Sequence, residues 1–283
     1  CGKTSAAIEQ PYDVYATAAD FGLSSNGTAE AKSYFASDLC VSEDVAIGTD
    51  STDSQVAEGA GTFNLETNTV VYAKNLYERL YPASTTKILT AYIALKYCDD
   101  LDAMVTVSEN AVNQASDSSV CNLKAGDVIR LRDLLYGLML RSGNDAAVAI
   151  AEYISGDVDS FAALMNQEAA AMGATRSHFV NPNGLPDENH YTCVYDMYLI
   201  FSNAIKNDTF VSIIGTTSYD VTYTDASGEA VTHTWENTNQ YLTGNATTPD
   251  GFQIVGGKTG TTGEAGYCLV LYSYNPSGQP IIS

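Results

Sequence analysis

The sequence predicts an α+β fold in which strands come first and last and a helical region is inserted between them. Residues 60–75 alternate in polarity on either side of a turn, and residues 253–283 hold two further runs typical of strands. Between them, residues 102–180 carry apolar side chains at three- and four-residue spacing, which is the period of a helix. We therefore expect the terminal strands to meet in one antiparallel sheet flanked by helices.

The individual elements can be placed in order along the chain. Two strands are predicted in AGTFNLETNTVVYAKN and a helix in YPASTTKILTAYIAL. Further helices are predicted in VIRLRDLLYGLMLRSGNDAAVAIAEYI, SFAALMNQEAAAMGA and YDMYLIFSNAIKN, and the breaker-rich NPNGLPDENHY is a predicted loop. TSYDVTYTDASGEAVTHTW is a predicted hairpin that turns at Asp-Ala-Ser-Gly, and the closing strands are QIVGGKTG and GYCLVLYSYNPSGQPIIS.

The chain divides into an extension and a domain. Residues 1–55 are rich in small and acidic residues, and GTDSTDSQ within them is typical of a linker. Residues 56–283 form the predicted domain, with an all-helical insertion over about residues 98–210.

Composition excludes several classes of function. A net charge of −21 argues against nucleic acid as a partner, because phosphate binding needs a basic surface. The three histidines lack H-E-x-x-H spacing and the cysteines lack C-x-x-C spacing, so a metallopeptidase, a zinc ribbon and a redox motif are all disfavoured. Cys98 and Cys268 are predicted to be buried thiols.

The first candidate motif is Ser84-x-x-Lys87, at the start of a predicted apolar helix. Three residues apart on a helix, the two side chains share a face. A serine hydroxyl needs a nearby base to become a nucleophile, and a lysine can be that base only if burial or a second cation lowers its pKa. Our interpretation is that Lys87 activates Ser84. The alternative is a helix-capping serine followed by an exposed lysine.

The second motif is Ser142-Gly143-Asn144, between two apolar helical runs. A hydroxyl and a carboxamide on a tight glycine turn can point into the same cleft, where Ser142 could relay protons and Asn144 could hold a substrate amide. The alternative is a simple cap and turn.

The third motif is Lys258-Thr259-Gly260, on a strand edge flanked by glycines. A fixed cation beside approachable backbone suits a substrate carboxylate, and its charge could lower the pKa of Lys87. A phosphate-binding loop is excluded, because the first glycine of that motif is missing and no helix follows.

Together and in this order, the three motifs are typical of penicillin-binding proteins and class A β-lactamases, although Gly143 stands where the lactamase form has Asp. From about Ala57 onward the chain resembles the serine-type D-alanyl-D-alanine carboxypeptidases of the low-molecular-mass penicillin-binding group. The blocks that carry the resemblance are RLYPASTTKILTAYIAL, LLYGLMLRSGNDAAVAIAEYI, FVNPNGLPDENHYTCVYDMYLI, ENTNQYL and GGKTGTTGEAGYCLV. It implies a β-lactamase/DD-peptidase-like fold with the active site between the sheet and the helical insertion.

The resemblance also implies roles. Ser84 would attack the carbonyl of the penultimate D-Ala in a peptidoglycan stem peptide, Lys87 would take its proton, and Ser142 would pass a proton to the leaving D-Ala. The backbone N–H groups of Ser84 and Thr261 would form the oxyanion hole. The implied substrate-binding residues are Asn144, Lys258, Thr259, Gly260 and Thr261.

No metal or organic cofactor is implied. The expected partners are stem peptides ending in D-Ala-D-Ala, with β-lactams as inhibitors that acylate Ser84.

Two alternatives for the function stay open. A class A β-lactamase would need a general-base glutamate followed four residues later by asparagine, which Glu152, Glu168 and Glu188 all lack. A penicillin-sensing or wall-binding module would keep the site without turnover.

The ends of the chain carry two expectations. CGKTSAAIEQ resembles the start of a mature bacterial lipoprotein, so Cys1 would carry a lipid and hold the protein on the outer face of the membrane. The alternatives are a secreted protein and a chain that merely begins there. The resemblance implies a further strand and helix after Ser283, so the domain is expected to be truncated at that end.

Overall fold

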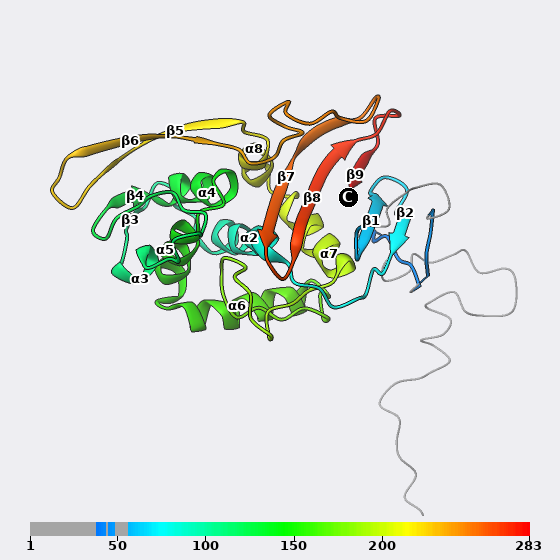
Figure 1. Ribbon diagram of the computed structural model, residues 1–283, viewed down its shortest axis with the longest axis horizontal. Coiled ribbons are helices and arrows are strands. Elements are labelled where there is room, and N and C mark those ends of the chain that lie inside the picture. The colour runs from blue at the N-terminus through cyan, green and yellow to red at the C-terminus, as the bar shows by residue number, and fades with distance from the viewer. Residues whose placement is uncertain (1–37, 44, 49–55) are drawn as a thin grey trace, which may run out of the picture.

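The computed structural model describes residues 38–43, 45–48 and 56–283, and arranges them as two antiparallel sheets with helices between them (Figure 1). The first sheet has the strand order β2-β1-β9-β8-β7 and the second the order β3-β4-β5-β6. The strands of the first sheet are β1 (Ala60–Asn64), β2 (Thr69–Lys74), β7 (Gln253–Thr262), β8 (Gly266–Tyr274) and β9 (Pro280–Ile282).

The first sheet confirms that the terminal strands meet. β1 pairs with β9 through Phe63↔Ile282, which joins residues more than two hundred positions apart. The remaining pairs are hairpins: β1 with β2, β7 with β8 and β8 with β9. This joining of the two ends makes residues 75–252 an insertion between β2 and β7, part of which packs on the sheet, as α7 does on β1.

The inserted region is mostly helical, as predicted. Its helices are the 3-10 turn η2 (Ala83–Thr86), α2 (Lys87–Tyr97), α3 (Glu109–Val112), α4 (Leu131–Leu140), α5 (Asn144–Ser155), α6 (Val158–Ala171), α7 (Val194–Ala204) and α8 (Asp208–Ile214). The short α8 was not predicted. Its start is fixed by Asn207, whose side chain accepts from the N–H groups of Thr209 and Phe210.

The prediction of an all-helical insertion is wrong in one respect. Residues 98–210 also contain β3 (Met104–Thr106) and β4 (Val128–Arg130), which join the hairpin β5 (Ser218–Thr224) and β6 (Ala230–Glu236) in the second sheet. Strands of three residues are too short to show an alternating pattern, so only their partners make them strands. Figure 1 shows the β5–β6 hairpin projecting away from the first sheet.

Helix α2 is the centre of the fold. It packs against α4, α5, α6 and α7, and residues on all its sides are buried, from Ile88 and Leu89 to Ile93. A helix apolar on every side is typical of a core rather than of a surface. None of the helices in the described part of the chain is long and apolar enough to cross a membrane.

The described part of the N-terminal segment contacts the domain. Cys40 is buried, and its N–H donates to Tyr198 Oη at 2.8 Å. Ile47 forms an isolated bridge with Ala73 on β2. Cys1 lies outside the described residues, and the boundary at residue 55 stays a prediction.

The five cysteines of the described residues are free thiols. Cys98 and Cys268, predicted to be buried, are only half-buried. Burial nevertheless raises the pKa of Cys268 to about 11, so it is a thiol rather than a reactive thiolate at neutral pH.

The contact between sheet and helix at Phe63 yields a stability prediction. Phe63 is buried and stacks on Tyr198 of α7 with ring centroids 4.1 Å apart. Phe63→Ala should lower the free energy of unfolding by about 3–5 kcal/mol, because it leaves a cavity there. Val71→Ala, at a position 51% exposed on β2, should change it by no more than about 0.5 kcal/mol. Urea denaturation of both variants checks this, and equal effects would contradict it.

Candidate active site

The structure brings the three motifs together from three separate segments. Ser84 lies in η2, Ser142 and Asn144 lie where α4 meets α5, and Lys258 lies on β7. Lys87 and Lys258 are 0% and 1% exposed, whereas Ser84 is half-buried. The hydroxyl of Ser84 is therefore the group in this set that solvent and a ligand can reach.

Ser84 lies in a 3-10 turn just before α2, which explains the Ser84–Lys87 contact. In a 3-10 turn the side chains at i and i+3 eclipse one another. Lys87 Nζ accordingly lies 2.9 Å from Ser84 Oγ. Ala83, just before the serine, has φ of +47°, a conformation that costs energy for a residue with a side chain and that is concentrated at functional sites.

Two further oxygens hold the Lys87 amine. Nζ lies 2.8 Å from Asn144 Oδ1 and 2.6 Å from the backbone carbonyl of Asn183. Burial holds the pKa of Lys87 well below its ordinary value, and the charge of nearby Lys258 lowers it further. Both effects favour the uncharged amine, which is the form that can accept a proton.

Lys258 forms the other half of the site. Its Nζ donates to Ser142 Oγ at 3.0 Å and to the carbonyl of Thr259 at 2.7 Å. Burial lowers the pKa of Lys258 to about 7, so its charge is held only loosely at neutral pH. An anionic group placed beside it would restore that charge.

The Ser142 turn is fixed by close packing. A Cβ on Gly143 would lie 2.4 Å from Cys121 Sγ, so glycine is needed for close approach. This explains why the aspartate of the lactamase motif is replaced here. The N–H of Cys121 donates to both carboxylate oxygens of Asp145, at 2.9 and 3.0 Å, which anchors the packed segment to α5.

Strand β7 passes directly beside the turn that carries Ser84. A Cβ on Gly260 would come 2.9 Å from Ser84 N and 3.1 Å from Ala83 Cβ, so only glycine allows this approach. Thr261 follows and is exposed. Thr259 Oγ1 lies 2.6 Å from Thr238 Oγ1, in the loop after β6. The predicted binding residues 258–261 thus run along the edge of the site.

Sequence reasoning missed Asn183 and Thr238. Asn183 contacts Lys87 through its backbone carbonyl, which any residue could provide. The sequence therefore shows only a loop rich in Asn, Pro and Gly at this place. Thr238 lies in the segment ENTNQYL that carried part of the resemblance, but no motif singles it out.

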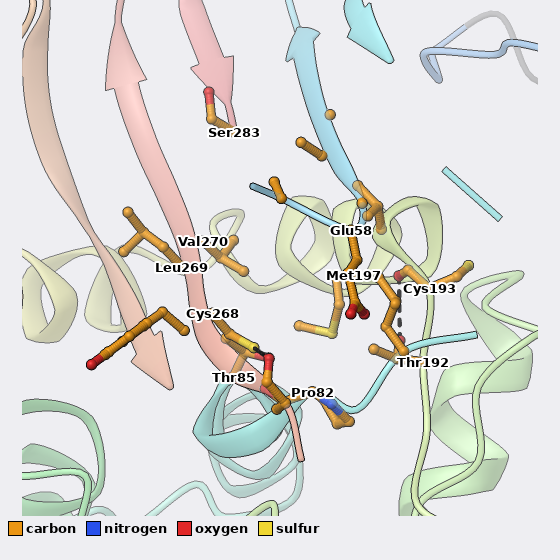
Figure 2. Close-up of a pocket in the computed structure, with 18 of the residues that line it drawn as sticks. Glu58, Pro82, Thr85, Thr192, Cys193, Met197, Cys268, Leu269, Val270 and Ser283 are labelled. Atoms are coloured by element: carbon orange, nitrogen blue, oxygen red, sulfur yellow. Dashed lines mark hydrogen bonds between the residues drawn. The ribbon is translucent and has the colours of Figure 1, made fainter. Parts of the chain in front are cut away.

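A separate cavity of about 1060 Å³ lies beside this site, between β1 and β8 (Figure 2). Pro82, Thr85 and Cys268 line it, whereas Ser84 and Lys258 do not. The cavity therefore adjoins the nucleophile turn without containing the reactive groups.

The glutamates considered for a lactamase do not face Ser84. They are Glu152, Glu168 and Glu188. Glu152 accepts from Ser108 Oγ at 2.6 Å, and Glu168 forms an ion pair with Lys96 at 2.6 Å. Glu188 is exposed in the loop before α7. None of the hydrogen bonds of these three described residues reaches Ser84 or Lys87, which weakens the lactamase alternative.

Comparisons with known proteins agree with this geometry. A family model described as D-alanyl-D-alanine carboxypeptidase matches residues 48–283. The D-alanyl-D-alanine carboxypeptidase of Streptomyces strain K15 is 36% identical over 236 residues, covering 80% of this chain and 79% of that protein. The D-alanyl-D-alanine carboxypeptidase DacF of Bacillus subtilis is 35% identical over 218 residues, covering 75% of this chain. The chain spans 53% of the Bacillus protein, about half its length.

Solved structures show the same fold. The crystal structure of the Streptomyces K15 DD-transpeptidase superposes with a TM-score of 0.73 at 35% identity, covering 80% of this chain and 87% of that one. A penicillin-binding protein homologue from Mycobacterium tuberculosis gives a TM-score of 0.69 at 29% identity. The predicted DD-peptidase fold is thus confirmed.

The close approach of β7 yields a test of the site geometry. Gly260→Ala should force β7 away from the Ser84 turn, lower the free energy of unfolding by about 1–3 kcal/mol, and slow labelling of Ser84 by a fluorescent penicillin. Gly263→Ala is the matched control, because a Cβ there meets nothing within 4 Å. Labelling rates and thermal unfolding are measured for both. Normal labelling of Gly260→Ala would show that the approach is unimportant.

Proposed function

The chain belongs to the D-alanyl-D-alanine carboxypeptidase family, and we propose that it removes the terminal D-alanine from peptidoglycan stem peptides through an acyl-enzyme on Ser84. The contact of 2.9 Å between buried Lys87 Nζ and half-buried Ser84 Oγ carries this proposal. It joins a base of lowered pKa to a hydroxyl that substrate can reach.

In the first step, Lys87 acts as an uncharged base. The carbonyl oxygens of Asn144 and Asn183 can only accept, so they take the two N–H groups of a neutral amine and leave its lone pair toward Ser84. The lone pair takes the Ser84 proton while Oγ attacks the carbonyl carbon of the penultimate D-Ala. Backbone N–H groups of Ser84 and Thr261 would stabilise the oxyanion.

Lys258 would hold the other end of the substrate. The terminal carboxylate would lie against Lys258 and the hydroxyl of Thr259, whose own partner is Thr238. The anion favours the charged form of Lys258, and that charge in turn favours the neutral form of Lys87. Binding of the substrate carboxylate would thus favour the neutral Lys87 that Ser84 needs for its attack.

Ser142 would complete the first half-reaction. The proton that Lys87 took from Ser84 would reach the departing nitrogen through Ser142, whose Oγ also accepts from Lys258. The C–N bond then breaks, D-alanine leaves with that proton, and Lys87 is neutral again. Water, activated by Lys87, would then attack the ester of Ser84 and release the shortened peptide. An amine in place of water would give transpeptidation, the activity named for the Streptomyces structure.

The proposed place of action is outside the cytoplasm, at the cell wall. Stem peptides ending in D-Ala-D-Ala and β-lactams are the partners that fit the family. Tethering through a lipid on Cys1 stays a prediction.

Release of D-alanine is the direct test of the function. A short peptide ending in Lys-D-Ala-D-Ala should lose its terminal residue to the intact chain, and Ser84→Ala should abolish turnover. The assay is run with and without an amine acceptor to separate hydrolysis from transfer. Unchanged release by Ser84→Ala would identify another nucleophile, and labelling by penicillin without release would favour a sensing module.

The pKa values of the two lysines predict the pH dependence. kcat/KM reports the free enzyme, in which Lys87 must be neutral and Lys258 charged. Activity should therefore fall on the alkaline side near pH 7, as Lys258 loses its proton. Lys258→Arg keeps the charge to much higher pH and should move this alkaline limb upward. A folded Lys258→Arg variant with an unchanged alkaline limb would contradict the assignment.

A further inference from the structure

Loop residues 178–191 include a buried histidine that the mechanism above does not use. His190 is 1% exposed and packs edge-on against Phe179, with centroids 5.4 Å apart. Its Nδ1 accepts from the N–H of Val180 at 3.1 Å. The ring proton must then lie on Nε2, which is 2.9 Å from Thr86 Oγ1 and donates to it. Burial lowers the pKa of His190 to about 4, which agrees with this neutral form.

Thr86 is the residue immediately before Lys87, and its side chain is fully buried. A Cβ on Gly184 would lie 3.0 Å from Thr86 Oγ1 and 1.8 Å from the carbonyl oxygen of Ala83. The loop therefore lies directly on the turn that presents Ser84. Any displacement of Thr86 moves the start of α2, and Lys87 with it.

Three hydrogen bonds join this loop to one turn and a half of helix. Besides the His190–Thr86 bond, Lys87 Nζ bonds the carbonyl of Asn183, and Thr90 Oγ1 donates to the carbonyl of Pro182 at 2.7 Å. Of these three bonds, only the one with the Asn183 carbonyl reaches the Lys87 amine, which is the proposed base. The two threonine bonds fix the distance between loop and helix, and so fix where that carbonyl lies.

We propose that His190 is a positioning residue for acylation, which acts through Thr86 to hold the Asn183 carbonyl against the Lys87 amine. This inference rests on the proposed function, because it assigns Lys87 as the base. The hydrogen bonds and ring contact of His190 go to Thr86, Val180 and Phe179 and not to Ser84 or Lys87, so its effect is on the orientation of the base rather than on the chemistry. Loss of the bond to Thr86 slows acylation more than it weakens substrate binding.

Two conservative substitutions separate this role from simple packing. The amide nitrogen of His190→Gln can take the place of Nε2 and keep the bond to Thr86. The amide of His190→Asn reaches only the position of Nδ1, so it keeps the bond to Val180 and loses the bond to Thr86. Thr86→Val removes the hydroxyl from the other side at nearly constant shape. His178→Asn, at an exposed histidine of the same loop, is the control.

The measurement is the acylation rate constant with a fluorescent penicillin, resolved from the prior binding constant, alongside thermal unfolding of each variant. We expect His190→Asn and Thr86→Val to acylate about tenfold to a hundredfold more slowly, with little change in binding. His190→Gln and His178→Asn should stay within about threefold of the parent chain.

Equal rates for His190→Gln and His190→Asn would overturn the inference, and so would normal acylation of Thr86→Val. If His190→Asn fails to fold, Thr86→Val decides alone. A parent chain that penicillin does not acylate would contradict the proposed function itself, together with the role of His190. Failure of the proposed function is distinguishable from failure of the His190 inference, because it is seen in the parent chain before any variant is made.

Discussion

The structure depends on the burial of one lysine amine. Lys87 is fully buried, and a charged ammonium without strong partners in that place would be costly. The site resolves this by offering two carbonyl oxygens and one hydroxyl and by placing a second cation, Lys258, near enough to disfavour the charge. Burial and the second cation both lower the pKa of Lys87 and so favour the uncharged amine, the form that can act as a base beside Ser84. The burial that makes a charged Lys87 costly for stability is also the largest cause of its lowered pKa.

Three distant parts of the chain must converge to build that environment. The first sheet, closed by the pairing of β1 with β9, places β7 against the nucleophile turn, and Gly260 lets the two backbones touch. The helices α4 and α5 meet at Ser142, where Gly143 packs on Cys121. The loop before α7 supplies the carbonyl of Asn183. Residue identity is constrained most where backbones approach, which is why glycine occurs in the second and third motifs.

Much of this could be predicted from the sequence. The period of the apolar residues predicted the order of strands and helices, and motif order predicted which side chains converge. What sequence could not provide was anything carried by backbone atoms or by short elements. The carbonyl of Asn183 has no side-chain signature, β3 and β4 are too short to show a period, and the 3-10 form of the Ser84 turn depends on packing. The pairing of His190 with Thr86 also depends on the fold, since no sequence pattern joins residues this far apart.

The protonation state of Lys87 is the most direct measure of this account. NMR of the chain labelled with ¹³C at the lysine side chains follows each amine through a pH titration, and Lys87→Met identifies the signal that belongs to the base. Lys258→Arg leaves a permanent second cation in place and removes the other shifted lysine from the spectrum. We predict that Lys87 is uncharged at neutral pH in the free protein. A titration in which Lys87 keeps its charge up to the pKa of an ordinary exposed lysine would contradict the mechanism at its first step.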